Sequence, residues 1–217
     1  MPACRPRRVS LRGRRIGRGR GRWDGAPMTA PWGWLAALVG RTDVPAEAPP
    51  ISRPPVSLTG AEVVARALSV VGQGRYRLGK GGRRPANPTP FDAAGLCDCS
   101  GFAAWSMGFD RYQPGRIAGD WISTTSLYND ATGPRRMFGA VELAAVQPGD
   151  LVVYPSRYRL GVRTSIGHVG VVVAATGPGW GGLDVVDCAG RLPPAIAHRP
   201  DGGALWGRRG GIVVRRV

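Results

Sequence analysis

The sequence predicts an α+β domain in which helices come first and an antiparallel sheet follows. Three observations carry this prediction. Residues 59–71 show helical spacing of apolar side chains, residues 99–107 suit a second helix, and valine-rich runs occupy the chain from residue 151 onward. Alternating βαβ units would interleave the two patterns instead.

The helical part is read from capping signals and spacing. Thr59 and Glu62 have the spacing of a capping box, apolar residues then recur at helical intervals, and Gly72 ends the pattern. Residues 75–90 are basic and rich in glycine and proline, which predicts a loop. The second helix places Cys99 at its N-terminus, and a third helix is expected over residues 120–128.

The strands are read from short valine-rich runs. A turn over residues 147–150 launches a strand at 151–154. Residues 168–174 and 183–188 predict two strands joined by a long hairpin loop, and residues 211–217 predict a closing strand.

Composition divides the 217 residues into three parts, with the folded domain at 59–217. Residues 1–27 hold nine arginines and one aspartate, supply eight of the sixteen net positive charges, and lack apolar periodicity, so we expect them to be disordered. Residues 28–58 are rich in proline, which predicts a linker.

The basic tail has three interpretations. It can bind an anionic polymer or nucleic acid, because arginine pairs bidentately with phosphate. It can be simply solvated, as charge runs usually are. Alternatively, Met28 is the true start and the tail is upstream sequence translated in error. Sequencing the N-terminus of the mature chain distinguishes the last possibility.

Neither a secretory signal nor a membrane span is recognisable. The basic stretch before residues 32–40 is long, the apolar run there is short, and no run approaches the ~20 apolar residues that a bilayer requires. We therefore expect cytoplasmic synthesis, with delivery to the cell wall or extracellular space by another route or from another start.

Four cysteines without regular spacing, Cys4, Cys97, Cys99 and Cys188, argue against a disulfide framework and favour chemistry or core packing. A thiol attacks an amide carbonyl only as thiolate, which is scarce near neutral pH for a free cysteine. A helix N-terminus and a nearby histidine both favour the thiolate. The predicted structure places Cys99 at a helix N-terminus, which is the first of these two environments.

Two histidines are available as the base. His168 begins a predicted strand between Gly167 and Gly170, which leave space for another backbone or a substrate beside the imidazole. His198 lies among loop residues, so His168 is the better candidate for the general base. Taken alone, His168 could equally be a satisfied histidine at a strand end.

Four ordered motifs together resemble the NlpC/p60 family of papain-like cell-wall cysteine peptidases. They are Tyr-Arg-Leu-Gly at 76–79, Asp-Cys-Ser-Gly-Phe at 98–102, Gln-Pro-Gly-Asp-Leu at 147–151 and Gly-His-Val-Gly-Val at 167–171. The resemblance covers residues 60–190. It implies a papain-like NlpC-type fold, in which a helix bearing the nucleophile packs on an antiparallel sheet bearing the histidine.

By that resemblance Cys99 is the nucleophile and His168 the base, and the substrates are amide bonds in the peptide stems of peptidoglycan. The family's third polar residue, usually His, Asn or Gln, is replaced here by Asp187, which could orient the imidazole if the strand register turns it inward. The bond that is cut is not readable from these residues.

Three further residues match family positions that line the substrate cleft: Tyr76, Asp98 and Ser100. Tyr76 could instead be a half-buried anchor and Asp98 the N-cap of the Cys99 helix. The oxyanion hole would use the backbone N–H of Cys99. No cofactor or metal is implied, and a monomer is expected. The basic segment 157–163 and Trp121 are expected to shape the cleft rim or to face the anionic wall.

Other functions stay open at this point. Cys97, Cys99, Cys188 and His168 could bind one zinc ion, although Cys-x-Cys is shorter than the usual spacing. The same fold could also bind wall peptides or a partner without catalysis, or transfer an acyl group to an acceptor other than water. The two remaining cysteines, Cys97 and Cys188, are by default small buried apolar residues.

Overall fold

The computed structural model describes residues 57–134, 137–190 and 193–217. The predictions for the tail at 1–27 and for residues 28–56 of the linker lie outside these residues. The helices are α1 (Gly60–Ser69), α2 (Cys99–Ser106), α3 (Thr124–Thr132) and α4 (Ala204–Arg208), with 3-10 turns η1 (Leu143–Ala145) and η2 (Trp180–Gly182). The strands are β1 (Arg75–Tyr76), β2 (Leu96–Cys97), β3 (Phe138–Val141), β4 (Leu151–Tyr154), β5 (Arg157–Arg159), β6 (Val162–Ser165), β7 (His168–Ala175), β8 (Leu183–Cys188), β9 (Ile196–Arg199) and β10 (Ile212–Arg216).

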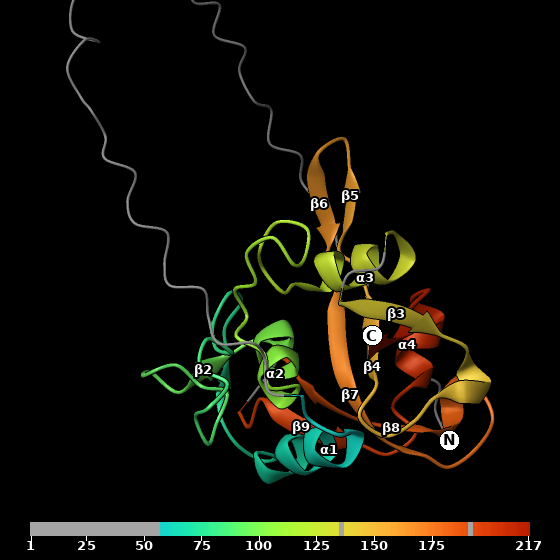
Figure 1. Cartoon of the computed structure of the whole chain (residues 1–217), viewed down its shortest axis with the longest axis horizontal. Helices are drawn as coiled ribbons and strands as arrows, with labels where there is room; N and C mark the ends of the chain where they lie inside the picture. Colours follow the sequence, from blue (N-terminus) through green and yellow to red (C-terminus); the bar gives the residue numbers. More distant parts are fainter. Residues whose placement is uncertain (1–56, 135–136, 191–192) are drawn as a thin grey trace, which may run out of the picture. The chain divides into compact units, whose positions relative to one another are not determined.

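Six strands form the central sheet in the order β3-β10-β4-β7-β8-β9, and every neighbouring pair in it is antiparallel (Figure 1). Two smaller sheets stand apart: β1 pairs with β2 in parallel, and β5 with β6 form an antiparallel hairpin. The prediction of an α+β fold with an antiparallel sheet is therefore confirmed.

The two faces of the sheet are covered by different helices. One face packs against α1, α2 and α3, and the other against α4, as Figure 1 shows around β7 and β4. Successive strand residues point to opposite faces. Val171 accordingly packs in the core beneath α1 to α3, whereas its neighbour Val172 packs with Trp206 of α4. Because both faces are buried, these strands are continuous valine runs rather than alternating ones.

The first two helices begin where the sequence predicts them. The capping box of α1 is complete, with the Thr59 hydroxyl accepting from the Glu62 N–H and the Glu62 carboxylate accepting from the Thr59 N–H. Gly72 follows α1 with φ +82°, a conformation that suits glycine. All eight residues of α2 are buried, because this helix packs against both α1 and the sheet.

The third helix is displaced by about one turn from its predicted position at 120–128. Ser123 caps it through the Ser126 N–H, so α3 starts at Thr124 and continues to Thr132. Asp120 takes a left-handed φ of +53° and accepts a hydrogen bond from the Gly115 N–H, which places it in the preceding loop. The helix itself was predicted, and the Ser123 cap, which the prediction did not use, fixes its start.

Several strand pairings differ from the simple sequence reading. The strand β10, expected to close the sheet, lies inside it between β3 and β4. Strands β3 and β9 were not predicted, and the basic segment at 157–163 forms most of the β5–β6 hairpin. Within the described ranges, no helix is long and apolar enough to cross a membrane.

Candidate active site

Cys99 is the first residue of α2, and the residue before it fixes the start of this helix. Asp98 is the N-cap, and its Oδ1 accepts from the Gly101 N–H at 2.8 Å. The positive end of the helix dipole is therefore directed at Cys99, and it stabilises negative charge on Sγ. A Cβ on Gly101 would come within 2.6 Å of the Lys80 carbonyl oxygen, so glycine is required there for the loop to cross the helix.

His168, the first residue of β7, faces Asp187 on the neighbouring strand β8. The distance from His168 Nε2 to Asp187 Oδ2 is 2.8 Å. Strand register produces this contact, because Gly170 pairs with Asp187, so His168 and Asp187 lie diagonally on one face. Cys188, one residue further, packs in the core on the opposite face. The strand thus has the register in which Asp187, and not Cys188, meets the imidazole.

The imidazole of His168 lies between three groups. It is hydrogen-bonded to Asp187, and it also interacts with the Cys99 thiol. The indole of Trp206 stacks on it, with ring centroids 5.4 Å apart and an interplanar angle of 18°. Burial alone would lower the pKa of His168, but the hydrogen bonds and negative charges of Asp187 and Cys99 outweigh burial and raise it to about 10. This environment favours the protonated, imidazolium form of His168.

The second oxygen of Asp187 is held by Arg199. Arg199 Nε donates to Asp187 Oδ1 at 2.8 Å, and the aspartate is only 1% exposed. Arg199 lies on β9 opposite Val185, two residues before Asp187, so it lies on the same face as the aspartate. A buried carboxylate with two cationic partners is the arrangement in which burying the charge is tolerated. Figure 1 shows β7, β8 and β9 side by side in this part of the sheet.

A pocket of about 250 Å³ opens beside Cys99. Its walls come from the loop after β1, the starts of α2 and α3, the loop between them, and the β5–β6 hairpin with its flanks. The pocket is also lined by Trp121 and by Tyr158 and Arg163 of the basic segment. This agrees with the expectation that these parts of the chain shape the rim of a cleft. The lining also includes Leu78, Asp98, Ser100, Arg111, Thr124, Ser156 and Ile166.

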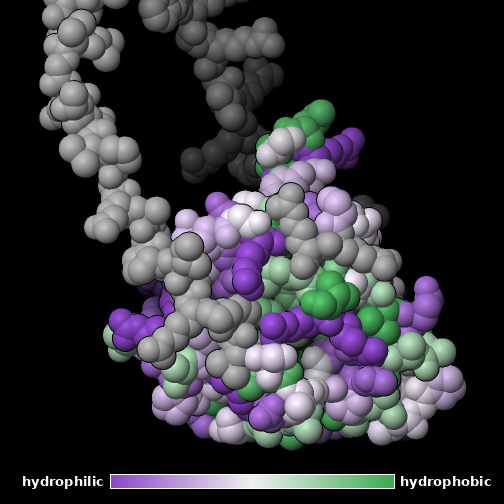
Figure 2. All heavy atoms as spheres, in the orientation of Figure 1, coloured by the Kyte–Doolittle hydropathy of each residue, from purple (hydrophilic) through white to green (hydrophobic). Residues whose placement is uncertain are grey.

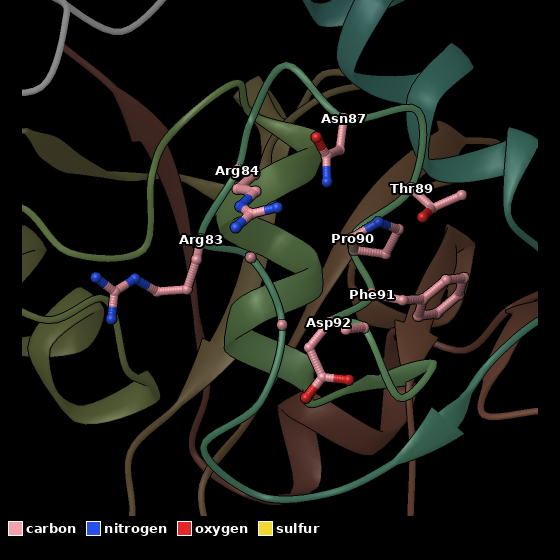
Figure 3. A pocket seen from close by; sticks show the side chains of 10 residues that line it. Arg83, Arg84, Asn87, Thr89, Pro90, Phe91 and Asp92 are labelled. Carbon is pink, nitrogen blue, oxygen red and sulfur yellow. The ribbon is translucent and has the colours of Figure 1, made fainter.

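A second hollow, of about 360 Å³, lies within the loop at 81–93 and contains neither Cys99 nor His168. Figure 3 shows Arg84 and Asn87 directed into it, while Arg83 points away. The outward direction of Arg83 agrees with its contacts, because its guanidinium lies 5.5 Å from the Trp121 ring centroid and 3.6 Å from the Asp110 carboxylate. The Cys99 thiol belongs to the smaller pocket, which therefore is the candidate active site.

Asp98 and Ser100 lie in the Cys99 pocket, but a buried arginine engages both. Arg111 Nη2 donates to Asp98 Oδ2 at 2.9 Å and to the Ser100 hydroxyl at 2.7 Å. Asp98 also accepts from the Gly79 N–H at 2.6 Å and is completely buried. The structural interpretation of Asp98 as N-cap is thus observed, and a contact between Asp98 and a substrate remains a prediction.

Tyr76 contacts the Cys99 thiol from the side of β1. Burial raises the pKa of its phenol, and the hydrogen bond and charge of Cys99 add to that effect, so Tyr76 stays protonated and can donate to a thiolate. A Cβ on Gly190 would lie 2.7 Å from the tyrosine ring, which shows how closely the chain after β8 covers it.

The remaining candidates lie away from this arrangement. His198 pairs with Val186 across the sheet, and its Nε2 lies 3.8 Å from Asp184 Oδ2. Hydrogen bonding to Cys97 and burial raise the pKa of Cys188, so this thiol stays protonated. No three His, Cys, Asp or Glu side chains among the described residues are grouped so as to hold a metal ion. The zinc arrangement considered above is therefore not formed by this part of the chain.

The glycines beside His168 allow other segments of the protein to approach closely. A Cβ on Gly167 would lie 2.3 Å from Thr124 Oγ1, and one on Gly170 would lie 2.4 Å from Val185 Cγ1. The first glycine lets α3 approach the strand, and the second lets β7 approach β8 and Trp206. Backbone atoms of neighbouring segments do lie beside both glycines, as expected, and Gly167 also lines the Cys99 pocket.

A comparison with solved structures finds proteins that are similar to this chain. The chain is similar to NlpC/P60 structures. It matches NlpC1 from Trichomonas vaginalis at 14% identity and TM-score 0.41, over 72% of this chain and 43% of that one. NlpC2 from the same organism matches at 12% identity and TM-score 0.41, over 72% of this chain and 45% of that one.

A Staphylococcus aureus protein described as similar to a lipoprotein of the NLP/P60 family matches at 20% identity and TM-score 0.39, over 73% of this chain and 43% of that one. The chain thus spans less than half the length of the solved proteins that it matches. No protein-family model matches it, and no curated protein matches it either.

Three residues of the site were missed at the sequence level. Arg199 and Trp206 follow the last recognised motif by more than 25 residues, and Arg111 lies in a loop without a pattern. The only available signal for Arg199 was its place in a β-compatible run, Ala195 to Arg199, directly after the strand that carries Asp187. The tryptophan and Arg111 gave no signal of their own.

Proposed function

We propose that the protein is a cysteine hydrolase that cuts amide bonds in peptidoglycan stem peptides, with residues 59–217 as its catalytic domain. The observation that carries the proposal is the placement of His168 between the Cys99 thiol and Asp187, at the N-terminus of a buried helix and beside a pocket. The motifs that resemble the NlpC/p60 family supply the substrate class.

In the first half of the reaction, the Cys99 thiolate attacks the amide carbonyl carbon and a C–S bond forms. The backbone N–H of Cys99 stabilises the oxyanion. His168, as imidazolium, then gives its proton to the amide nitrogen, the C–N bond breaks, and the amine leaves a thioester on Cys99.

In the second half, His168 takes a proton from water, which attacks the thioester carbonyl. Collapse of this second intermediate releases the carboxylic acid product and restores the thiolate and imidazolium. Asp187 keeps the imidazole in the orientation and tautomer that both steps need. The indole of Trp206 restricts rotation of the ring out of that plane, since it stacks at 18°.

Substrate contacts are assigned to the pocket side of Cys99. Ser100 and Asp98 line the pocket, and the Tyr76 phenol interacts with the Cys99 thiol. Asp98 is held by Arg111, so a substrate amine would meet a carboxylate whose charge is already balanced. Arg111 engages the Ser100 hydroxyl as well. We propose that Tyr76, Asp98 and Ser100 together contact the peptide.

Digestion of purified peptidoglycan tests the proposal. The wild-type protein and Cys99→Ala are incubated with the polymer, and the released fragments are identified by mass spectrometry. Fragments cut within the stem by the wild type alone would establish the nucleophile and name the bond. Binding of both proteins without any release would refute hydrolysis of this substrate and favour a binding module on the same fold.

A further inference from the structure

The β5–β6 hairpin exposes a cluster of apolar side chains. Tyr158 is 59% exposed, Leu160 97% and Val162 68%. Four of the seven large hydrophobic side chains that are exposed in the described residues lie between positions 158 and 166. Figure 2 shows hydrophobic surface at the end of this hairpin directly beside strongly hydrophilic surface. Isolated exposed apolar residues are ordinary, whereas a cluster on a protruding element indicates a contact surface.

The turn of the hairpin contains a leucine in a backbone conformation that leucine rarely adopts. Arg159 pairs with Val162, so Leu160 and Gly161 form a two-residue turn, with φ of +50° and +77°. Such turns favour Asn-Gly, because both positions need a positive φ, and a leucine there is conformationally strained. Leu160 is almost fully exposed, so no contact within the described residues offsets either the strain or the exposure. A contact outside the molecule would offset both.

Positive charge surrounds the apolar tip. The hairpin carries Arg157, Arg159 and Arg163, and no aspartate or glutamate occurs from residue 151 to residue 183. Within the described part of the chain, none of these arginines forms an ion pair with a carboxylate. The partner of this surface is therefore anionic.

The base of the hairpin is tied to the domain, so the tip is held away from it. The Ser156 N–H donates to Thr125 Oγ1 at 3.3 Å, and the Gly167 N–H donates to the Ser156 hydroxyl at 3.0 Å. Arg157 Nη2 donates to the Arg209 carbonyl oxygen at 3.0 Å. Figure 1 shows the hairpin projecting past α3 and away from the central sheet.

We propose that the β5–β6 hairpin binds the surface of an anionic lipid bilayer. Leu160 and Val162 enter the boundary between headgroups and acyl chains, while Arg159 and Arg163 pair with lipid phosphates. Three apolar side chains are too few for the ~1,200 Å² or more of a stable protein interface. A soluble polyanion would satisfy the arginines but would leave the apolar tip in water. The inference does not depend on the proposed hydrolase activity.

Contact with lipid would also orient the candidate active site. Tyr158 and Arg163 are cross-strand partners in the hairpin, and both line the Cys99 pocket. The pocket would therefore open next to the membrane surface when the hairpin is bound.

Vesicle sedimentation of the full chain tests this proposal. Binding is compared between vesicles of phosphatidylcholine alone and of phosphatidylcholine mixed with phosphatidylglycerol. The variant Leu160→Asn restores the favoured Asn-Gly turn, so loss of folding does not confound the result. We expect Leu160→Asn to weaken binding to the mixed vesicles about tenfold, as removal of a buried leucine would. Leu68→Asn, the same change at an exposed position of α1, should bind like the wild type.

The arginines supply a second, independent measurement. Arg159→Gln and Arg163→Gln should each weaken binding to the mixed vesicles about fivefold, an effect that disappears with neutral vesicles. The basic tail is present in every variant, so its own attraction to the vesicles cancels in these ratios.

Three results would overturn the proposal. They are no binding of the wild type to the mixed vesicles, equal binding of wild type and Leu160→Asn, and an equal loss of affinity of Leu160→Asn for soluble polyphosphate, which would identify a polyanion site without lipid insertion.

Discussion

Asp187 divides its two oxygens between an imidazole and a guanidinium, and this division governs the charge of the site. Oδ2 contacts His168 and Oδ1 contacts Arg199, each at 2.8 Å. An isolated buried carboxylate would hold the histidine proton very strongly, which would hinder its return to the leaving amine. Arg199 balances part of that negative charge. In the proposed mechanism, the orienting residue is thus a charged carboxylate, and Arg199 is its counterion.

Arg199→Gln should therefore raise the pKa of His168 above its value of about 10, because one of the positive charges near Asp187 is removed. NMR titration of the His168 ring protons measures this directly. Arg199→Lys keeps the charge and should restore most of the wild-type titration, whereas a purely structural role of Arg199 would leave the titration midpoint unchanged in both. Arg208→Gln, an exposed arginine of α4, is the matched control.

Asp187→Asn should lower the pKa of His168, since the amide oxygen can still accept a hydrogen bond but carries no charge. Amide hydrolysis should fall by about ten- to a hundredfold, the range found when an orienting partner is changed. The matched control is Asp184→Asn on the same strand, whose side chain contacts the Asp201 N–H on the other side of the sheet. Full activity of Asp187→Asn would contradict an orienting role for this carboxylate.

Among the residues of the candidate site, those that lie on recognisable motifs were predicted from the sequence. The residues that contact them from other parts of the chain were not. Cys99 and His168 were predicted from one helix start and one strand start, and Asp187 was predicted from the resemblance to the NlpC/p60 family. Arg199 and Trp206 reach the same imidazole only through the pairing of β8 with β9 and the packing of α4 on the sheet. Such pairings join distant segments, and local spacing carries no information about them.

The elements around the site depend on close backbone contacts, and α2 is the sharpest case. The loop at 80–82 crosses the first turn of α2 so closely that a Cβ on Gly101 would lie 2.6 Å from the Lys80 carbonyl oxygen and 3.0 Å from the Gly81 carbonyl carbon. These are backbone atoms, which cannot rotate away as a side chain can. The position of Cys99 thus depends on a residue two places further along the helix.

Gly101→Ala should accordingly destabilise the fold by about 1–3 kcal/mol, the range for overpacking, and should reduce hydrolysis by displacing the helix start. Urea unfolding measures the first effect. Gly181→Ala is the matched control, because nothing lies within 4 Å of its added Cβ, and its stability should change by less than about 0.5 kcal/mol. Equal stability of the two variants would show that the loop yields to the methyl group.

Elements with strong local signals were predicted and those defined by pairing were not. The capping box fixed the start of α1, and valine runs gave β4, β7 and β8 within one residue. Strands β3 and β9 are four residues long and contain alanine, glycine or histidine, so propensity alone does not mark them. The place of β10 between β3 and β4 is a long-range property that no local pattern encodes.

For the whole molecule, the charge cluster at Cys99, His168 and Asp187 links stability to pH. The pKa of His168 rises from its ordinary value of 6.5 to about 10 in the folded protein, so the folded state holds this proton more tightly than the unfolded state does. The resulting stabilisation is fully present below about pH 6.5 and is lost as pH rises through about 10.

The free energy of unfolding should therefore fall between these two pH values, and it should fall less in Asp187→Asn, in which the pKa of His168 is closer to normal. Urea unfolding of both proteins across this pH range measures the difference between their free energies of unfolding. The titration of other groups cancels in this difference. Asp184→Asn should follow the wild-type curve, because its side chain lies on the opposite face of β8. Parallel curves for the wild type and Asp187→Asn would mean that the imidazolium–carboxylate pair contributes nothing to folding, and that the two groups meet for chemistry alone.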